Sequence, residues 1–262
     1  RVQATDELGA TSIHLFPVNI EDTNDAPTSN SSVVNFTTPE GVSWSTQTWN
    51  RVYGGIGNDW LYDIIAAHDG GLVLAGTSDS NASGNKSTNS KGKKDFWVIK
   101  TDLAGNKLWD VTIGGSGDDL CAGIIPTSDA NYLLFGHSDS PADGDKSQAS
   151  HGDDDFWIVK IDQNGSKIWD KRYGSENTEI CNFAKELNNG DIVLGGRSIS
   201  DPYADKSTAN LGNQDGWLLR LDENGTKIWD YSYGGSGWDE LKGVDILTGG
   251  NLLLFGESSS SN

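Results

Sequence analysis

The chain is a succession of short apolar runs separated by turns rich in Gly, Asn, Asp and Ser. Continuous or alternating apolar runs of this length, bounded by turn residues, are typical of β-strands. None of the runs has the periodicity of an amphipathic helix. A representative stretch therefore predicts four strands, over residues 121–127, 132–138, 155–162 and 167–174.

The turns group these strands into pairs. The first two strands are joined by tetrapeptides such as 68–71 and 128–131, and the last two by tetrapeptides such as 163–166 and 223–226. Asn and Gly tolerate the positive φ that tight hairpins require. Both pairs are therefore expected to be β-hairpins, and a longer loop rich in Ser, Asn, Asp and Gly, residues 79–94 in the first unit, connects them.

The whole pattern repeats at a fixed interval, the one that separates Trp97 from Trp157 and Trp157 from Trp217. Seven of the ten tryptophans occupy two columns of the repeat, which are Trp49, Trp109, Trp169 and Trp229, and Trp97, Trp157 and Trp217. Other residues recur in the same register: Gly54, Gly114, Gly174 and Gly234; Lys86, Lys146 and Lys206; Asp95, Asp155 and Asp215. A fixed period is the signature of architectures in which each unit buries its apolar faces against its neighbours.

A four-stranded antiparallel unit repeated in tandem predicts an all-β protein, a β-propeller whose blades are the repeating units. The turn D-x-x-G-x-K-x-W, as in residues 222–229, resembles the tryptophan-docking turn of quinoprotein-type propellers, which implies an indole packed between adjacent blades. The wider pattern, from residue 44 onward, is similar to tandem repeats in large secreted proteins of Bacteroidota that are often exported by the type IX secretion route. That resemblance implies a secreted or cell-surface protein.

The propeller is expected over residues 49–262, as a fragment of a ring. A leading strand at Trp49 precedes three full units and a fourth that ends after its second strand, whereas propellers usually have ~4 to 8 blades. We expect the leading strand to complete the sheet of the last blade. The absence of methionine indicates an excerpt of a longer protein, whose other domains are expected partners.

Residues 1–48 differ from the repeat. Residues 1–27 contain an alternating strand and an Asx-rich linker, and they resemble the closing strands and linker of a cadherin-like β-sandwich domain. The resemblance implies calcium, a hard cation that takes oxygen ligands, with the ligands Asp6, Asp22, Asn24 and Asp25. The alternative is an Asx-rich turn that ends a strand. Residues 28–48 are expected to be a polar linker.

Composition narrows the classes of partner. The 19 Lys and Arg against 38 Asp and Glu give a net charge of −19, and nucleic acid or anionic lipid would be repelled by so acidic a surface. The sequence has no apolar stretch approaching the ~18 residues that span a bilayer. The 10 Trp and 33 Gly argue against disorder and against a helical bundle.

Ionisable residues that recur in every unit are expected to be structural, because a catalytic role would require identical active sites throughout the repeat. The acidic column formed by Asp59, Asp119, Glu179 and Asp239 belongs to this class. So do the recurring lysine and aspartate columns, which are expected to pair within each blade and hold the long loop down.

Residues that break the repeat are better candidates for ligand contact. Exposed aromatic side chains can stack on sugar rings, and the aromatic residues outside the shared columns include Trp60, Tyr203 and Trp238, although packing is the simpler role. The long loop of the second unit concentrates carboxylates at Asp139, Asp143 and Asp145. Calcium is one interpretation of this loop, but its spacing lacks the EF-hand pattern, so a solvated acidic loop is the default.

The cysteines and histidines carry no recognisable catalytic motif. Cys121 and Cys181 share an apolar strand column, which predicts two buried free thiols. A disulfide between neighbouring units is the alternative, and it would need Cα atoms within ~7 Å. No nucleophile elbow, CxxC pair, P-loop or dinucleotide fingerprint is present, and no organic cofactor is expected.

These observations favour a non-catalytic extracellular module that serves in adhesion or binds a protein or glycan through the propeller. The alternative is a propeller enzyme, either a glycosidase or lyase acting on polysaccharide or a quinoprotein-like enzyme. Fold alone does not fix function. The enzyme hypothesis predicts polar residues that break the repeat at the inner ends of strands. Few are present, chiefly Lys185, Glu186 and Arg197.

Overall fold

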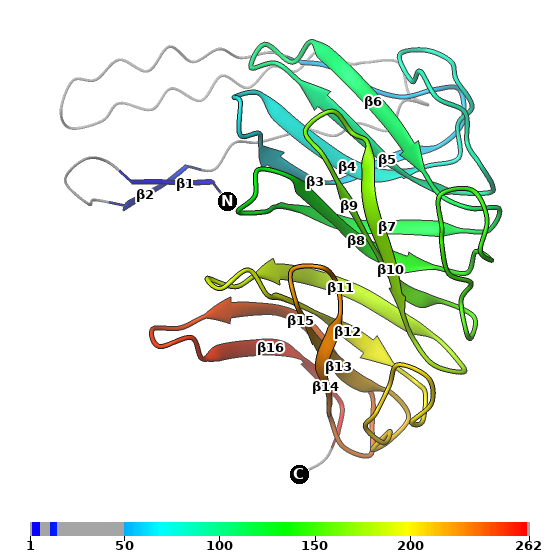
Figure 1. Ribbon diagram of the computed structural model, residues 1–262, viewed down its shortest axis with the longest axis vertical. Coiled ribbons are helices and arrows are strands. Elements are labelled where there is room, and N and C mark those ends of the chain that lie inside the picture. The colour runs from blue at the N-terminus through cyan, green and yellow to red at the C-terminus, as the bar shows by residue number, and fades with distance from the viewer. Residues whose placement is uncertain (1, 6–10, 15–49, 261–262) are drawn as a thin grey trace.

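The computed structural model describes residues 2–5, 11–14 and 50–260. All its strands pair in an antiparallel manner (Figure 1). A two-stranded ribbon comes first, β1 (Val2–Thr5) with β2 (Thr11–His14). The first sheet is β3 (Asp59–Ala66), β4 (Leu72–Ser78), β5 (Asp95–Thr101) and β6 (Lys107–Ile113). The second is β7 (Asp119–Pro126), β8 (Tyr132–Ser138), β9 (Asp155–Ile161) and β10 (Lys167–Tyr173).

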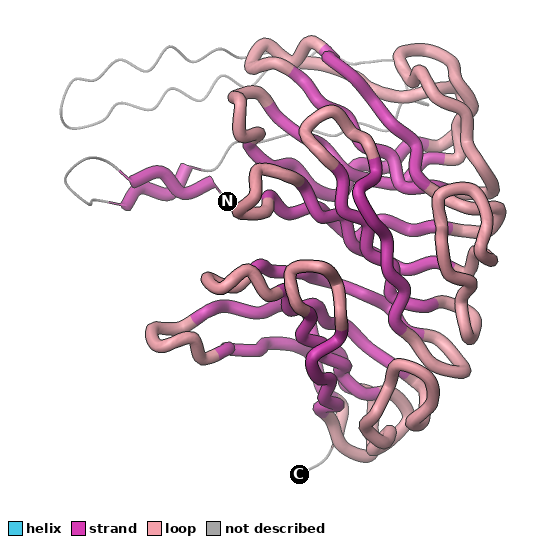
Figure 2. The backbone as a smooth tube through the Cα atoms, viewed as in Figure 1, coloured by secondary structure: helices cyan, strands magenta, loops and turns pink. Residues whose placement is uncertain are grey.

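The third sheet is β11 (Glu179–Glu186), β12 (Ile192–Ser198), β13 (Asp215–Leu221) and β14 (Lys227–Tyr233), and a last hairpin pairs β15 (Asp239–Ile246) with β16 (Leu252–Ser258). In each sheet the strand order follows the chain order. The long loops between second and third strands lie together on the right of Figure 2, at what we call the long-loop end, and the turns of the hairpins lie at the opposite, short-turn end.

The sheets pack in series through their first strands. Strand β7 packs on β3 and β4, β11 packs on β7 and β8, and β15 packs on β11 and β12. A backbone hydrogen bond joins each sheet to the next, from the N–H of Asp119 to the carbonyl of Lys94 at 2.7 Å and from Glu179 to Asp154 at 2.7 Å. Successive units are therefore held in one fixed register.

The core lies between the sheets. Trp97, Trp157 and Trp217 have no exposed surface, and the ring of Phe96 in the first sheet lies 4.8 Å from that of Trp157 in the second. A β-carbon added to Gly165 would lie 3.1 Å from the Trp109 ring. The indole of Trp109 therefore rests on the β9–β10 turn of the next sheet, as Trp169 rests on Gly225.

The structure confirms the all-β class and the four-stranded unit in series, and β8 has the predicted bounds, 132–138. The described sheets do not close into a ring. Residues 50–58 contain no strand, and Trp49, which would begin the leading strand, lies outside the described residues. The segment predicted to be cadherin-like is described only at β1 and β2, so this prediction and the division at residues 27 and 48 stay predictions.

Candidate functional site

A buried carboxylate organises each sheet. The indole N–H of Trp157 donates to Oδ2 of Asp170 at 3.1 Å, the Ser147 N–H donates to the same oxygen at 2.8 Å, and Lys167 Nζ lies 2.8 Å from Oδ1. Burial raises the pKa of Asp170, but the hydrogen bonds from Lys167, Ser147 and Trp157 outweigh it and hold that pKa below its usual range. Equivalent networks surround Asp110 and Asp230. The sequence reasoning missed this column, although the Trp-Asp dipeptide recurs at residues 109–110, 169–170 and 229–230.

A second set of carboxylates meets at the junctions between sheets. A β-carbon on Gly114 would lie 1.9 Å from Oδ1 of Asp95 and 2.8 Å from Oδ2 of Asp119, so only glycine fits between them. Burial raises the pKa of Asp119 to about 6 and that of Asp155 to about 6. Both side chains have no exposed surface, so these groups build the junctions and are closed to a substrate.

The recurring lysines hold the long loops through neutral oxygens. Lys146 is 3% exposed and donates to the Ser138 hydroxyl at 2.7 Å, the Ser140 carbonyl at 2.9 Å and the Ser150 hydroxyl at 2.6 Å. Burial lowers the pKa of Lys146 to about 8. The predicted ion pairs with the aspartate column are wrong, because none of Lys86, Lys146 and Lys206 forms an ion pair with the described residues. An ammonium has three donors, and for Lys146 oxygens at the end of β8 and in the long loop satisfy them.

The acidic loop of the second sheet faces a basic loop of the first sheet. Asp145 pairs with Lys91, Asp139 Oδ2 lies 3.8 Å from Lys93 Nζ, and Lys93 Nζ also lies 3.4 Å from Asp118 Oδ2. Asp143 instead accepts the backbone N–H of Ser116 at 2.9 Å. Among residues 50–260, no three His, Cys, Asp or Glu side chains are arranged to hold a metal ion.

On the side of the third unit, the acidic loop of the second unit faces no basic loop among the described residues. The positions of Lys93 and Lys94 are occupied in the second unit by Asp153 and Asp154, and the facing Asp118 is replaced in the third unit by Thr178. The change from acid to threonine removes a like-charge contact that the repeat would otherwise create. The first junction therefore forms ion pairs, and the second lacks the acidic residue that would repel Asp153 and Asp154.

The three aromatic side chains singled out from the sequence lie at the long-loop end. The exposed fractions are 37% for Trp60, 52% for Tyr203 and 57% for Trp238. Lys94 Nζ lies 6.0 Å from the Trp60 ring centroid, and the His151 ring lies 5.8 Å from that of Tyr203. They belong to the first, third and last units, and no ring contact within residues 50–260 joins them.

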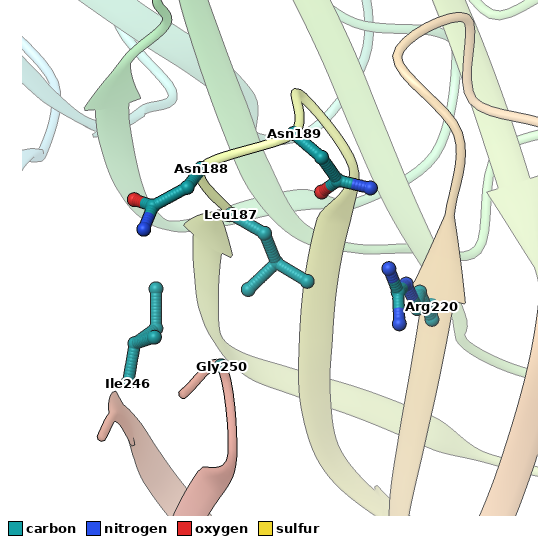
Figure 3. A pocket seen from close by; sticks show the side chains of 6 residues that line it. All are labelled: Leu187, Asn188, Asn189, Arg220, Ile246 and Gly250. Carbon is teal, nitrogen blue, oxygen red and sulfur yellow. The ribbon is translucent and has the colours of Figure 1, made fainter. Parts of the chain in front are cut away.

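A small pocket lies at the opposite, short-turn end (Figure 3). Its volume is about 210 Å³, and it is lined by Leu187, Asn188, Asn189, Arg220, Ile246 and Gly250. Arg220 on β13 is held by Asp191, whose Oδ2 lies 2.8 Å from Nε and 2.6 Å from Nη2. The pocket therefore opens between the β11–β12 turn and the β15–β16 turn, and sequence reasoning did not find it.

The remaining predicted site residues are placed as follows. Cys121 and Cys181 are free, buried thiols, and burial holds the pKa of each well above its usual range. Asp6, Asp22, Asn24 and Asp25 lie outside the described residues, so calcium at the linker stays a prediction. No helix long and apolar enough to cross a membrane occurs in the part of the chain that is described.

Comparison with known proteins gives one distant similarity. No protein-family model matches the chain. In an alignment of 209 residues that covers 75% of the chain, the chain is 22% identical to the regulatory protein FlaEY of Caulobacter vibrioides. The match spans 22% of the length of that protein.

Proposed function

We propose that the chain is a non-catalytic adhesion or binding module of a large secreted or surface-displayed bacterial protein. Its sheets are, in this proposal, blades of a β-propeller. The stacking of first strands and the docking of Trp109 and Trp169 on the next sheet support the propeller architecture. Protein or glycan partners contact the ends of the sheets.

The observation that carries the binding role is the separation of two kinds of side chain. The recurring lysines Lys86, Lys146 and Lys206 and the recurring aspartates Asp95, Asp155 and Asp215 are buried in contacts within and between sheets. Two large aromatic side chains that break the repeat, Tyr203 at 52% and Trp238 at 57%, are exposed at the long-loop end. Tyr and Trp are enriched in binding interfaces because they combine a large apolar surface with a polar atom.

The enzyme alternative needs a titratable group that a substrate can reach. The two carboxyls with the largest upward pKa shifts, Asp119 and Asp155, are candidates by their pKa of about 6. Both have no exposed surface and both belong to recurring columns. They therefore give the enzyme hypothesis no support.

The test of the proposed function is binding of the labelled chain to an array of extracellular polysaccharides and to bacterial cell surfaces. The double variant Tyr203→Ala/Trp238→Ala removes the two most exposed aromatic rings of the long-loop end. Ile168→Ala is the matched control, because Ile168 is 49% exposed and the same column holds Leu108 and Ile228.

A further inference from the structure

The pocket at the short-turn end has a counterpart one unit earlier in the chain. The β7–β8 turn is closed by a hydrogen bond from Ala130 N to Thr127 O at 3.0 Å. The β11–β12 turn, at the equivalent place in the next unit, is closed in the same way, from Gly190 N to Leu187 O at 2.9 Å. The two turns therefore offer equivalent backbone groups to the sheet that follows each of them.

At the junction between the second and third sheets, a carboxylate lies beside the β7–β8 turn. Glu186 is the last residue of β11 and reaches back to the preceding sheet. Its Oε2 accepts the backbone N–H of Ser128 at 2.7 Å, and its Oε1 accepts the Ser128 hydroxyl at 3.1 Å. Ser128, the first central residue of the turn, thus donates two hydrogen bonds to one carboxylate.

At the later junction the carboxylate is replaced by an apolar side chain. Ile246 stands in the column of Glu186, and Asn188 stands in the column of Ser128. Neither the backbone N–H nor the side-chain amide of Asn188 has a hydrogen-bond partner among residues 50–260. Both Ile246 and Asn188 line the pocket, so the space opens where the internal carboxylate is missing.

We propose that this pocket, lined by the six residues named above, binds the carboxylate group of a small ligand. The ligand carboxylate takes the place that Glu186 takes at the earlier junction and accepts from the N–H and the side-chain amide of Asn188. Leu187 and Ile246, which Figure 3 shows on the third sheet and on the last hairpin, contact its carbon skeleton. An acidic sugar and an acidic peptide side chain share this chemistry.

Each of the two sites lies beside one ion pair. The occupied site lies beside the pair Lys160–Asp129, whose Nζ and Oδ2 are 2.7 Å apart. The open pocket lies beside the pair Arg220–Asp191. Asp191 engages Nε and Nη2 of Arg220, which leaves the Nη1 donors for a ligand. A carboxylate is accommodated beside the first pair. The open pocket has one more carboxylate near its turn, because Glu223 Oε2 would lie 3.6 Å from a β-carbon on Gly190 and the earlier unit has Gln163 at this place.

Long-range charge predicts how the binding responds to salt. The chain carries a net charge of −19 and repels an anionic ligand at a distance. Added salt screens this repulsion, so binding strengthens as ionic strength rises. The site lies at the end of the sheets opposite the exposed aromatic residues, and it goes beyond the proposed function because it does not depend on adhesion.

The experiment is a titration of the isotope-labelled chain, followed through its backbone amide resonances, with sodium glucuronate, N-acetylaspartate and glucose at constant ionic strength. The proposal expects a saturable shift of the Asn188 amide with glucuronate, with N-acetylaspartate or with both, and no such shift with glucose. A response to one acid alone identifies the sugar or the peptide class. No saturable shift, or an equal shift with glucose, overturns the proposal.

Variants separate the site from a general effect on the fold. Neither Asn188 nor Asn189 has a positive φ, so the turn accepts proline at its first central position. Asn188→Pro removes both the N–H and the side-chain amide, and binding, followed at the Asn189 amide, is expected to weaken at least tenfold, the effect of losing a single charged hydrogen bond. Thr248→Pro makes the same change in the next turn and is expected to leave binding unaltered. Full affinity in Asn188→Pro contradicts the proposal.

An exchange between the two junctions gives a second test. Ile246→Glu supplies an internal carboxylate and should abolish the titration of the Asn188 amide. Glu186→Ile removes the carboxylate at the earlier junction and should add a second saturable response, at the Ser128 amide. If Ile246→Glu still binds glucuronate or N-acetylaspartate as the unaltered chain does, the carboxylate assignment is wrong.

Discussion

The indole N–H of Trp157 donates to Oδ2 of Asp170 at 3.1 Å, and the two side chains are 0% and 6% exposed. The same pair recurs as Trp97–Asp110 and Trp217–Asp230, at 3.1 and 3.0 Å. A buried carboxylate is costly without donors, and here the donors come from the long loop and from the neighbouring strand. This contact therefore ties three segments of each sheet together.

Replacing the indole tests the contact. Trp157→Phe removes the N–H while keeping an aromatic ring, and it leaves a buried acceptor with one donor fewer. We expect a loss of about 2–4 kcal/mol in the free energy of unfolding, from the charged hydrogen bond and the reduced packing. Urea unfolding measures it. Trp60→Phe, at a side chain 37% exposed, is the control and should change stability by less than ~0.5 kcal/mol.

Docking of one sheet on the next is tested at Gly225. Its φ is +78°, a β-carbon there would lie 3.3 Å from the Trp169 ring, and its carbonyl accepts the Tyr173 hydroxyl. Gly225→Ala should therefore destabilise the protein by more than the ~1–2 kcal/mol that a positive φ alone costs. Gly70→Ala is matched, since Gly70 has φ +82° and nothing within 4 Å of an added β-carbon. Equal losses of stability would show that the docking contributes nothing.

The buried carboxyls predict an unusual response to pH. Burial raises the pKa of Asp119 from 3.8 to about 6, so the folded chain holds a proton that the unfolded chain has lost between these values. The stabilising contribution is complete below the unfolded pKa and is lost as the pH rises through 6. Asp155 has the same sign. Burial lowers the pKa of His137 to about 4. Between pH 4 and 6.5 this histidine makes stability rise with pH, which offsets the effect of one of the two carboxyls.

Asp119→Asn removes the ionisable carboxyl, so a comparison with the unaltered chain isolates the contribution of Asp119 to the pH dependence of stability. Between pH 4 and 6 the unfolding free energy of the unaltered chain, relative to the variant, should fall by about 1.4 kcal/mol per pH unit. Chemical unfolding at fixed temperature across this range measures the difference. A constant difference between the two proteins would mean that the Asp119 carboxyl has its ordinary pKa.

The different charges at the first and second junctions predict unequal effects for two opposite substitutions. Asp118→Thr copies the third unit and loses only partly exposed ion pairs, so it should cost less than about 1 kcal/mol. Thr178→Asp places a carboxylate beside Asp153 and Asp154 and should destabilise the chain, by an amount that added salt reduces. Thermal unfolding at low and high salt measures both. A salt-independent loss in Thr178→Asp would point to a steric cause.

Much of the fold could be predicted because the same columns are buried in every unit. Trp97, Trp157 and Trp217 share both a register and complete burial, so the period alone identifies the strands and the core. The partners of ionisable groups were harder to predict. Lys146 was expected to pair with Asp155, because both recur in every unit. Its ammonium instead donates to Ser138 at the end of β8 and to Ser140 and Ser150 in the long loop.

The candidate site depended on contacts between units, which spacing within one unit does not reveal. The carboxylates of residues 139–145 left a solvated acidic loop and a calcium loop as interpretations, and the lysines that pair with Asp139 and Asp145 come from the preceding unit. The replacement of Glu186 by Ile246 is visible in the repeat. Its meaning depends on the contact between Glu186 and Ser128, which only the structure shows.

The central claim is that side chains which break the repeat, at the ends of the sheets, make the partner contacts. The most direct measurement compares binding of three labelled chains to extracellular polysaccharides and cell surfaces: the unaltered chain, Tyr203→Ala/Trp238→Ala and Ile168→Ala. The account predicts at least a tenfold loss for the double variant, about 1.4 kcal/mol or more, and none for Ile168→Ala. Equal binding by all three chains, or a loss confined to Ile168→Ala, would contradict it.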